Sequence, residues 1–156
     1  MRIAETGVMV SFQNILVPYD FGEPSKHALE VAMDLAKKYR SSLTLVHTWE
    51  FPSFTYGGAE LAALEPFTVI EAEAQRELDA LLTRVRKQIP QAQAVLRRGS
   101  PWREVLAAIE EAKPDLVVMG THSRRGLSRA LLGSVTEKIV RTSPAPVLTV
   151  GAAQER

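Results

Sequence analysis

The sequence contains no cysteine. Disulfide bonds, thiol catalysis and cysteine-ligated metal sites are therefore excluded. It also contains no apolar run of the roughly 18 residues that a membrane-spanning helix requires. The segment Met1–Phe12 is too short, and too interrupted by Glu5 and Gly7, to act as a signal peptide. We therefore expect a cytoplasmic protein without a membrane segment.

Neither sign of charge is in excess, because 19 lysines and arginines oppose 18 aspartates and glutamates and leave a formal net charge of +1. This near-balance argues against a dedicated nucleic-acid-binding protein and against a strongly membrane-attracted surface. Aromatic residues make up only 6%, whereas the hydrophobic content of 46% fits an ordinary globular protein. The 156 residues predict a flexible N-terminal arm over residues 1–12, one domain over residues 13–151 and a C-terminal tail over residues 152–156.

Motifs for metal binding and catalysis are scarce as well. The histidines His27, His47 and His122 have no spacing typical of a metal site. The sequence has no G-x-S-x-G nucleophile elbow, no P-loop and no G-x-G-x-x-G fingerprint after the first strand. We therefore predict no metal site and no catalytic residue, and the sequence favours a binding or regulatory protein over an enzyme.

Short apolar runs alternate with amphipathic stretches along the chain. The apolar runs predict strands over residues 15–17, 43–47, 94–96, 116–119 and 147–150. The amphipathic stretches predict helices over about residues 22–39, 65–89, 100–112 and 133–142. Gly22 and Ser100 are the expected N-caps of two of them, because Pro24 and Pro101 fit the first turn that follows. This alternation predicts an α/β fold with a parallel sheet and helices on both faces.

The longest irregular stretch, Trp49 to Leu64, is rich in aromatic residues. A loop of this length in a compact domain is usually functional or disordered, and its aromatic content argues against disorder. A lid over a ligand, a subunit contact and plain packing all remain open for it. In the helix that follows, the apolar positions from Ile70 to Ile89 are expected to face the core.

A loop rich in glycine and hydroxyl groups follows the apolar run Leu116–Met119. It begins Gly120-Thr121-His122-Ser123-Arg124-Arg125-Gly126 and ends at Gly133-Ser134. A strand that leads into such a loop and then into a helix is typical of a phosphate site. Glycines let backbone N–H groups approach an anion, and the helix N-terminus adds partial positive charge. Alternatively, the glycines serve turns that need positive φ, and Ser134 serves as an N-cap.

Two other segments are expected near this loop, because ligands of open α/β sheets bind at the carboxyl ends of strands where the strand order reverses. Pro18-Tyr19-Asp20 follows the first strand, and Val46-His47-Thr48 ends the second. Asp20 can accept a hydrogen bond from a base edge or a ribose hydroxyl. Alternatively, it is a solvated carboxylate that stabilises the N-terminus of the first helix.

Several segments together closely resemble the universal stress protein family over residues 12–150. They are Ile15–Asp20 with Pro24-Ser25, Leu45–His47, Gly120–Gly126, Gly133–Lys138 and Ser143–Leu148. The resemblance implies a five-stranded parallel sheet in the order 3-2-1-4-5, an adenine-nucleotide-hydrolase-like Rossmann-type fold. It also implies a stress-response regulator that forms a homodimer through its last strand, Val147–Val150.

Family members that bind ATP carry the pattern G-x2-G-x9-G-[S/T] after the fourth strand. Here Gly120 and Gly133-Ser134 match it with the spacing intact, and Ser123 replaces the middle glycine. By the resemblance, Asp20 and the backbone of Val46 match adenosine-contacting positions. The full set of candidate residues for ATP, with Mg, is Pro18, Asp20, Val46, Met119, Gly120, His122, Ser123, Arg124, Gly126, Gly133, Ser134, Val135 and Thr136.

Ser123 separates the functional hypotheses. If the middle position needs positive φ, a serine there costs about 1–2 kcal/mol, although it also adds a hydroxyl donor. The sequence thus predicts a stress-response regulator that binds an adenine nucleotide. The alternatives are a family member that does not bind ATP and acts through protein contacts, and an ATP-hydrolysing enzyme. Arg124, Arg125 and Arg129 either clamp the phosphates or form a solvated loop face. Gly22 is a second departure, since the family frequently has a serine there.

Overall fold

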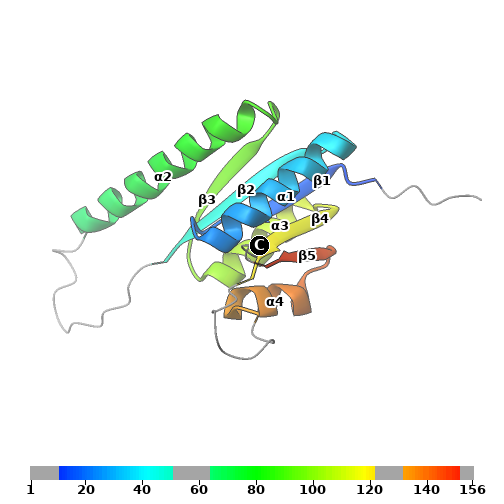
Figure 1. Ribbon diagram of the computed structural model, residues 1–156. Coiled ribbons are helices and arrows are strands. Elements are labelled where there is room, and N and C mark those ends of the chain that lie inside the picture. Colours follow the sequence, from blue (N-terminus) through cyan, green and yellow to red (C-terminus); the bar gives the residue numbers. More distant parts are fainter. Residues whose placement is uncertain (1–10, 51–63, 122–131, 152–156) are drawn as a thin grey trace, which may run out of the picture.

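The computed structural model describes residues 11–50, 64–121 and 132–151. Within these residues, five parallel strands form one sheet in the order β3-β2-β1-β4-β5 (Figure 1), which confirms the predicted α/β fold and strand order. The strands are β1 (Asn14–Pro18), β2 (Ser42–Trp49), β3 (Gln93–Arg98), β4 (Leu116–Gly120) and β5 (Val147–Val150). The helices are α1 (Glu23–Tyr39), α2 (Leu64–Arg86), α3 (Pro101–Ala112) and α4 (Ser134–Thr142).

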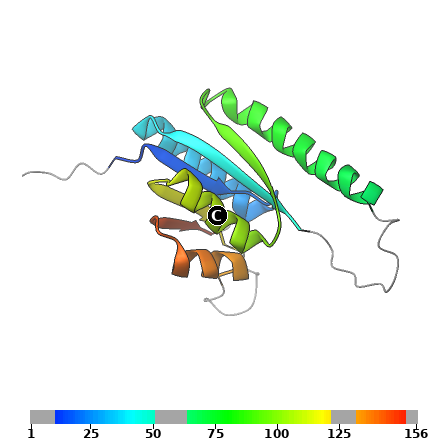
Figure 2. The ribbon, with the colours of Figure 1, turned by 180° about the vertical axis from the view of Figure 1, so that it is seen from behind.

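Helices cover both faces of the sheet, with α1 and α2 on one face and α3 and α4 on the other (Figures 1 and 2). Alternate residues of β1 contribute to the two cores. Ile15 and Val17 are buried in the core beneath α1 and α2, whereas Leu16 is buried in the core beneath α3 and α4. A central strand of a parallel sheet is covered on both faces, so it is apolar at successive positions rather than at alternate ones. This is why a short continuous apolar run predicted β1 correctly.

The helix starts follow the predicted caps in two of three cases. Gly22 is the N-cap of α1 in an extended conformation, with φ −78°, and Ser100 is the N-cap of α3. At α4, however, Gly133 occupies the N-cap and Ser134 is the first helical residue. The expectation that Ser134 caps this helix is therefore wrong. A glycine N-cap leaves the first-turn N–H groups without a side-chain acceptor from the cap residue.

Helix α2 departs from its predicted limits, and its predicted inner face is confirmed except at Ile70. It ends at Arg86 rather than at Ile89, because Lys87 and Gln88 form tighter turns with Arg84 and Val85. Ile70 was expected to face the core, but it is 41% exposed. The N-terminal part of α2 extends past the edge of the sheet (Figure 1), so no strand lies beneath it. Helical periodicity identifies a helix face but does not show how far the sheet beneath it reaches.

Strand β2 is longer than its apolar run predicts and includes Trp49, which was assigned to the irregular stretch. Trp49 and Thr48 pair with Arg98 and Arg97 of β3, and the Arg98 guanidinium carbon lies 5.3 Å from the centroid of the Trp49 ring. Pairing with the neighbouring strand therefore extends β2. The remainder of the stretch, residues 51–63, lies outside the described residues.

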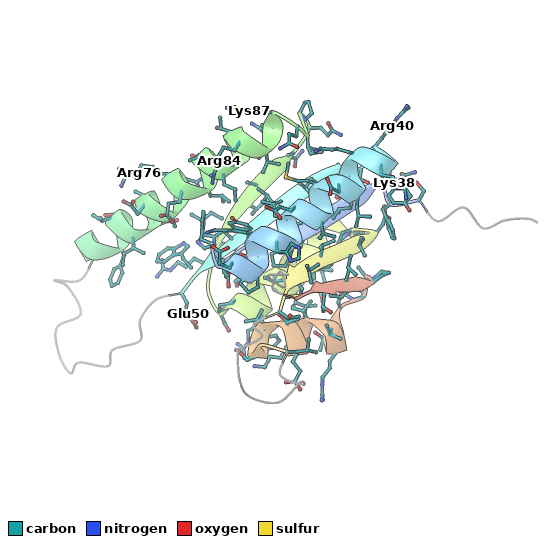
Figure 3. The ribbon with its side chains drawn as sticks, viewed as in Figure 1. Lys38, Arg40, Glu50, Arg76, Arg84 and Lys87 are labelled. Carbon is teal, nitrogen blue, oxygen red and sulfur yellow. The ribbon has the colours of Figure 1, made fainter. Side chains whose placement is uncertain are left out.

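Basic side chains lie in the last turns of α1 and α2. Figure 3 labels Lys38 in the last turn of α1, Arg84 in the last turn of α2 and Lys87 just after it. Cations at these ends oppose the negative end of the helix dipole. Because the helices run antiparallel to the strands, these charges lie at the end of the sheet where the strands begin. No helix in the described ranges is both long and apolar enough to cross a membrane.

Candidate functional site

A cavity of about 270 Å³ lies at the carboxyl ends of β1, β2 and β4. This is the point where the strand order reverses, because the chain crosses to β2 on one side of β1 and β4 lies on the other. The cavity is lined by Pro18, Tyr19, Asp20, Pro24, Ser25, Val46, Thr48, Pro101, Val105, Met119, Gly120, Gly133, Ser134, Val135 and Thr136. The fold therefore brings together segments that are far apart in the sequence, as expected from the strand ends.

The floor of the cavity is apolar and formed by strand ends. Pro18 ends β1, Val46 lies in β2, and Met119 precedes the last residue of β4. Val46 is 1% exposed, and its carbonyl oxygen accepts the N–H of Tyr19 at 2.8 Å. That bond continues the pairing of β1 with β2 past Pro18. A flat apolar group such as a purine ring fits a floor of this kind.

Asp20 is held at the N-terminus of α1 by its own carboxylate. Its Oδ1 atom accepts the Gly22 N–H at 2.9 Å and the Ser25 hydroxyl at 2.7 Å. Ser25 is only 5% exposed whereas Asp20 is exposed, so this hydrogen bond is partly shielded from water. A Cβ atom on Gly22 would lie 3.0 Å from Asp20 Oδ1, so glycine at this position leaves room for the carboxylate. Ser25 was absent from the candidate set, although it lies in a segment that carries the family resemblance.

Gly120 is a glycine because β4 ends against the backbone of α1. A Cβ atom on Gly120 would lie 2.4 Å from the carbonyl carbon of Pro24 and 2.7 Å from the backbone nitrogen of Ser25. The φ angle of Gly120 is not positive. Among the described residues, the glycine with a positive φ is Gly99. The hypothesis that Gly120 serves a turn with positive φ is therefore wrong. Close packing of two backbones requires it instead.

Three helices begin at the cavity, namely α1, α3 and α4. Their N-caps are Gly22, Ser100 and Gly133, and none of the three makes a side-chain capping hydrogen bond. The carboxyl ends of the strands and these helix starts lie on the same side of the molecule, at the left in Figure 1. The first N–H groups of a helix have no acceptor within it and carry partial positive charge. The cavity thus presents backbone donors to an anion on the side of α4.

On α4, Ser134, Val135 and Thr136 line the cavity with different exposures. Ser134 is exposed, Val135 is half-buried, and Thr136 is 3% exposed. The Thr136 hydroxyl donates a hydrogen bond of 3.0 Å to the carbonyl oxygen of Gly120. Its single proton is therefore engaged within the protein, so the donors that this turn can offer a ligand are its N–H groups and the exposed Ser134 hydroxyl.

The acid–base chemistry of the cavity is limited. Among its lining residues, Asp20 is the one with an ordinarily charged side chain. Burial raises the pKa of the Tyr19 hydroxyl, so that group stays neutral and does not act as a base near neutral pH. Within the described ranges, no group of three or more histidine, aspartate or glutamate side chains is placed to hold a metal ion.

The comparisons with known proteins agree with this geometry. The model of the Universal stress protein family matches residues 11–151. The chain belongs to the universal stress protein family. A relative from Thermus aquaticus, the "universal stress protein in QAH/OAS sulfhydrylase 3′ region", is 34% identical over 145 residues, which cover 89% of this chain and 98% of the relative.

Solved structures of other universal stress proteins share the fold. A universal stress protein in complex with cAMP has a TM-score of 0.65 and 22% identity, and the match covers 92% of this chain and 100% of that one. A universal stress protein family protein from Arabidopsis thaliana with AMP bound has a TM-score of 0.61 and 18% identity, and the match covers 90% and 92%. At these identities the likeness establishes that this universal stress protein has the same Rossmann-like α/β fold.

Most of the predicted site residues of this universal stress protein line one cavity. Those are Pro18, Asp20, Val46, Met119, Gly120, Gly133, Ser134, Val135 and Thr136. The other candidates, His122, Ser123, Arg124 and Gly126, lie outside the described residues, as do Arg125 and Arg129. The lining residues that were not among the candidates are Tyr19, Pro24, Ser25, Thr48, Pro101 and Val105, although Tyr19 and Thr48 lie in the segments that were expected at the cavity. Pro101 and Val105 reach the cavity because α3 packs beside β2, and no motif in their own segment indicates this.

Proposed function

We propose that this universal stress protein is a stress-response regulator of the cytoplasm that binds an adenine nucleotide in the cavity at the ends of β1, β2 and β4. The observation that supports this most directly is that the cavity has two kinds of lining. Pro18, Val46 and Met119 are apolar, and the N-terminus of α4, which has no side-chain cap, also lines the cavity. A nucleotide has two matching parts, an apolar base and anionic phosphates.

The residues take distinct roles in this proposal. The base lies on the apolar floor beside Val46, and Asp20 accepts a hydrogen bond from the base edge or the ribose. The N–H groups of Ser134 and Val135, in the first turn of α4, donate to the phosphates. The bound cAMP and AMP of the two neighbours named above support an adenine nucleotide as the ligand.

We further propose ATP as the nucleotide, because Gly120 and Gly133-Ser134 keep the spacing of the ATP-binding pattern. We expect Mg²⁺ to bind together with ATP, coordinated by the phosphates. The carboxylate of Asp20 already accepts two hydrogen bonds, and this proposal does not assign it to the metal ion. The proposed role of the protein is binding rather than turnover.

Two measurements on the purified protein test this proposal. One looks for nucleotide that copurifies with the protein, and the other follows thermal unfolding in the presence of adenosine, AMP, cAMP or Mg-ATP. At a ligand concentration 100-fold above its dissociation constant, binding adds about 2.7 kcal/mol to the free energy of unfolding. We expect a raised unfolding temperature with an adenine nucleotide and a smaller rise with GTP. The absence of any shift at millimolar nucleotide, together with no copurifying nucleotide, would overturn the proposal.

Ser123 supports a second candidate function, a family member that acts through protein contacts without ATP. This alternative would be favoured if the wild-type protein binds no nucleotide and the Ser123→Gly variant binds one. Nucleotide binding by the wild-type protein would contradict it. Sustained release of phosphate or AMP, lost on substitution of Asp20, would instead favour the enzyme.

A further inference from the structure

Thr136 joins the two chain segments that flank the glycine-rich loop. Its hydroxyl donates to the carbonyl oxygen of Gly120, the last residue of β4, across 16 positions of sequence. Thr136 lies in the first turn of α4 and is 3% exposed. A buried hydroxyl with a single well-placed acceptor fixes the relative position of the two segments that it connects.

Gly120 is a rigid anchor for this hydrogen bond. On one side it packs directly against the backbone of Pro24, where there is no space for a Cβ atom. The next residue, Thr121, donates its N–H to the carbonyl oxygen of Val150 at 2.9 Å. The end of β4 is thus fixed against both α1 and β5. A bond from Thr136 to this point therefore sets the position of α4 and not the position of β4.

We propose that Thr136 is a positioning residue for phosphate recognition. Its bond to Gly120 holds the first turn of α4 so that the N–H groups of Ser134 and Val135 face the phosphates before the ligand arrives. Such preorganisation raises affinity because less ordering is left to occur on binding. This inference rests on the proposed function. In this proposal Thr136 acts indirectly, by holding α4 in place. Its hydroxyl proton is donated to Gly120 and is therefore not available to a phosphate.

Calorimetric titration of adenosine, AMP and Mg-ATP into wild-type protein and four variants tests this role. Thr136→Val removes the hydroxyl and keeps the shape, Thr136→Ala is a smaller replacement in case the valine variant does not fold, and Thr136→Ser keeps the hydroxyl. Thr142→Val is the matched control, because Thr142 is also on α4 and donates to a backbone carbonyl, that of Lys138, at 2.8 Å. We expect Thr136→Val and Thr136→Ala to lose on the order of fivefold in ATP affinity, as for one neutral hydrogen bond. We expect adenosine affinity to stay unchanged, and both Thr136→Ser and Thr142→Val to behave as wild type.

The outcomes separate the positioning role from the proposed function. Equal losses for adenosine and ATP would show a general structural effect and overturn the positioning role, as would unchanged ATP affinity in Thr136→Val. Wild-type protein that binds none of the three ligands would overturn the proposed function, and the positioning role with it. Amide hydrogen exchange of the free protein adds a measurement without ligand. The first protected amide of α4 is that of Glu137, which donates to the carbonyl oxygen of Gly133. Faster exchange at residues 137–138 in Thr136→Ala than in Thr142→Val supports the anchoring of α4, and equal exchange contradicts it.

Discussion

Gly120 at the end of β4 lies directly against Pro24 in the first turn of α1, so that a Cβ atom on Gly120 would be 2.5 Å from the carbonyl oxygen of Pro24. This contact brings the end of β4 and the start of α1 together at one side of the cavity. The first glycine of the nucleotide pattern therefore has a packing role that does not depend on any ligand. It explains why two elements almost a hundred positions apart in sequence meet at the site.

Replacing Gly120 with alanine should destabilise the protein. The Cβ atom meets backbone atoms that cannot rotate away, so either β4 or α1 must move, and overpacking of this kind costs about 1–3 kcal/mol. Urea unfolding followed by circular dichroism measures the loss. Gly151→Ala is the matched control, because the nearest atom to its Cβ is Thr121 Oγ1 at 4.0 Å. Equal stabilities for the two variants would contradict the packing role.

Removal of the Ser25 hydroxyl should weaken binding at the base end of the cavity. Asp20 Oδ1 accepts hydrogen bonds from the Ser25 hydroxyl and from the Gly22 N–H. Ser25→Ala deletes the first of these and leaves the second. We expect adenosine and ATP to lose affinity by a similar factor, and a loss of stability of about 1 kcal/mol. Calorimetry with both ligands measures the first effect. Ser42→Ala, which removes a hydroxyl bonded to the Gln13 carbonyl far from the cavity, should bind as wild type. A loss confined to ATP would contradict this role of Ser25.

The ion pairs of Arg97 should make part of the stability depend on pH. Arg97 of β3 bonds both carboxylate oxygens of Glu111 on α3, at 2.8 and 3.0 Å, and Glu104 at 3.1 Å. The hydrogen bond from Arg97 and its charge lower the pKa of Glu111 in the folded state. The pair therefore stabilises the fold above the unfolded pKa of a glutamate, about 4.3, and this contribution is lost as the pH falls through the lower folded value.

Glu111→Gln should accordingly be less stable than wild type near neutral pH. The two proteins should be equally stable at a pH where Glu111 is protonated in both the folded and the unfolded state. Denaturant unfolding across this pH range measures the difference. Glu110→Gln is the control, because the adjacent Glu110 forms no ion pair within the described part of the chain. A difference from wild type that does not change with pH would contradict the assignment to Glu111 ionisation.

The outer edge of β5 offers backbone groups to a second copy of the chain. Val117 and Thr121 donate to the carbonyls of Pro146 and Val150, so the intervening Thr149 directs its N–H away from β4. If the homodimer that the family resemblance implies forms through Val147–Val150, Thr149→Pro should convert it to a monomer, because proline removes this donor. Thr149→Val keeps the N–H and should remain dimeric. Light scattering distinguishes these states, and a monomeric wild-type protein would rule out this dimer.

Local sequence patterns predicted the elements of this protein well. Apolar runs and helical periodicity report which segments are strands or helices, and Pro24 and Pro101 mark two helix starts because proline fits the first turn. The same patterns failed at Ile70 and Trp49. Whether Ile70 is covered depends on the length of the sheet beneath α2, and Trp49 joins β2 through pairing with Arg98 of β3. Both are properties of neighbouring elements.

Residue patterns and motifs were enough to predict the strand and helix segments, the family and the segments that meet at the cavity. The contacts of each site residue depend on the tertiary structure. Gly120 meets Pro24, Asp20 accepts the Ser25 hydroxyl, and Thr136 donates to Gly120. Hydrogen bonds and steric contacts act over a few ångströms between whichever backbones the strand order makes adjacent. A periodic pattern reports the buried face of an element, and it does not report the atoms that the element meets there.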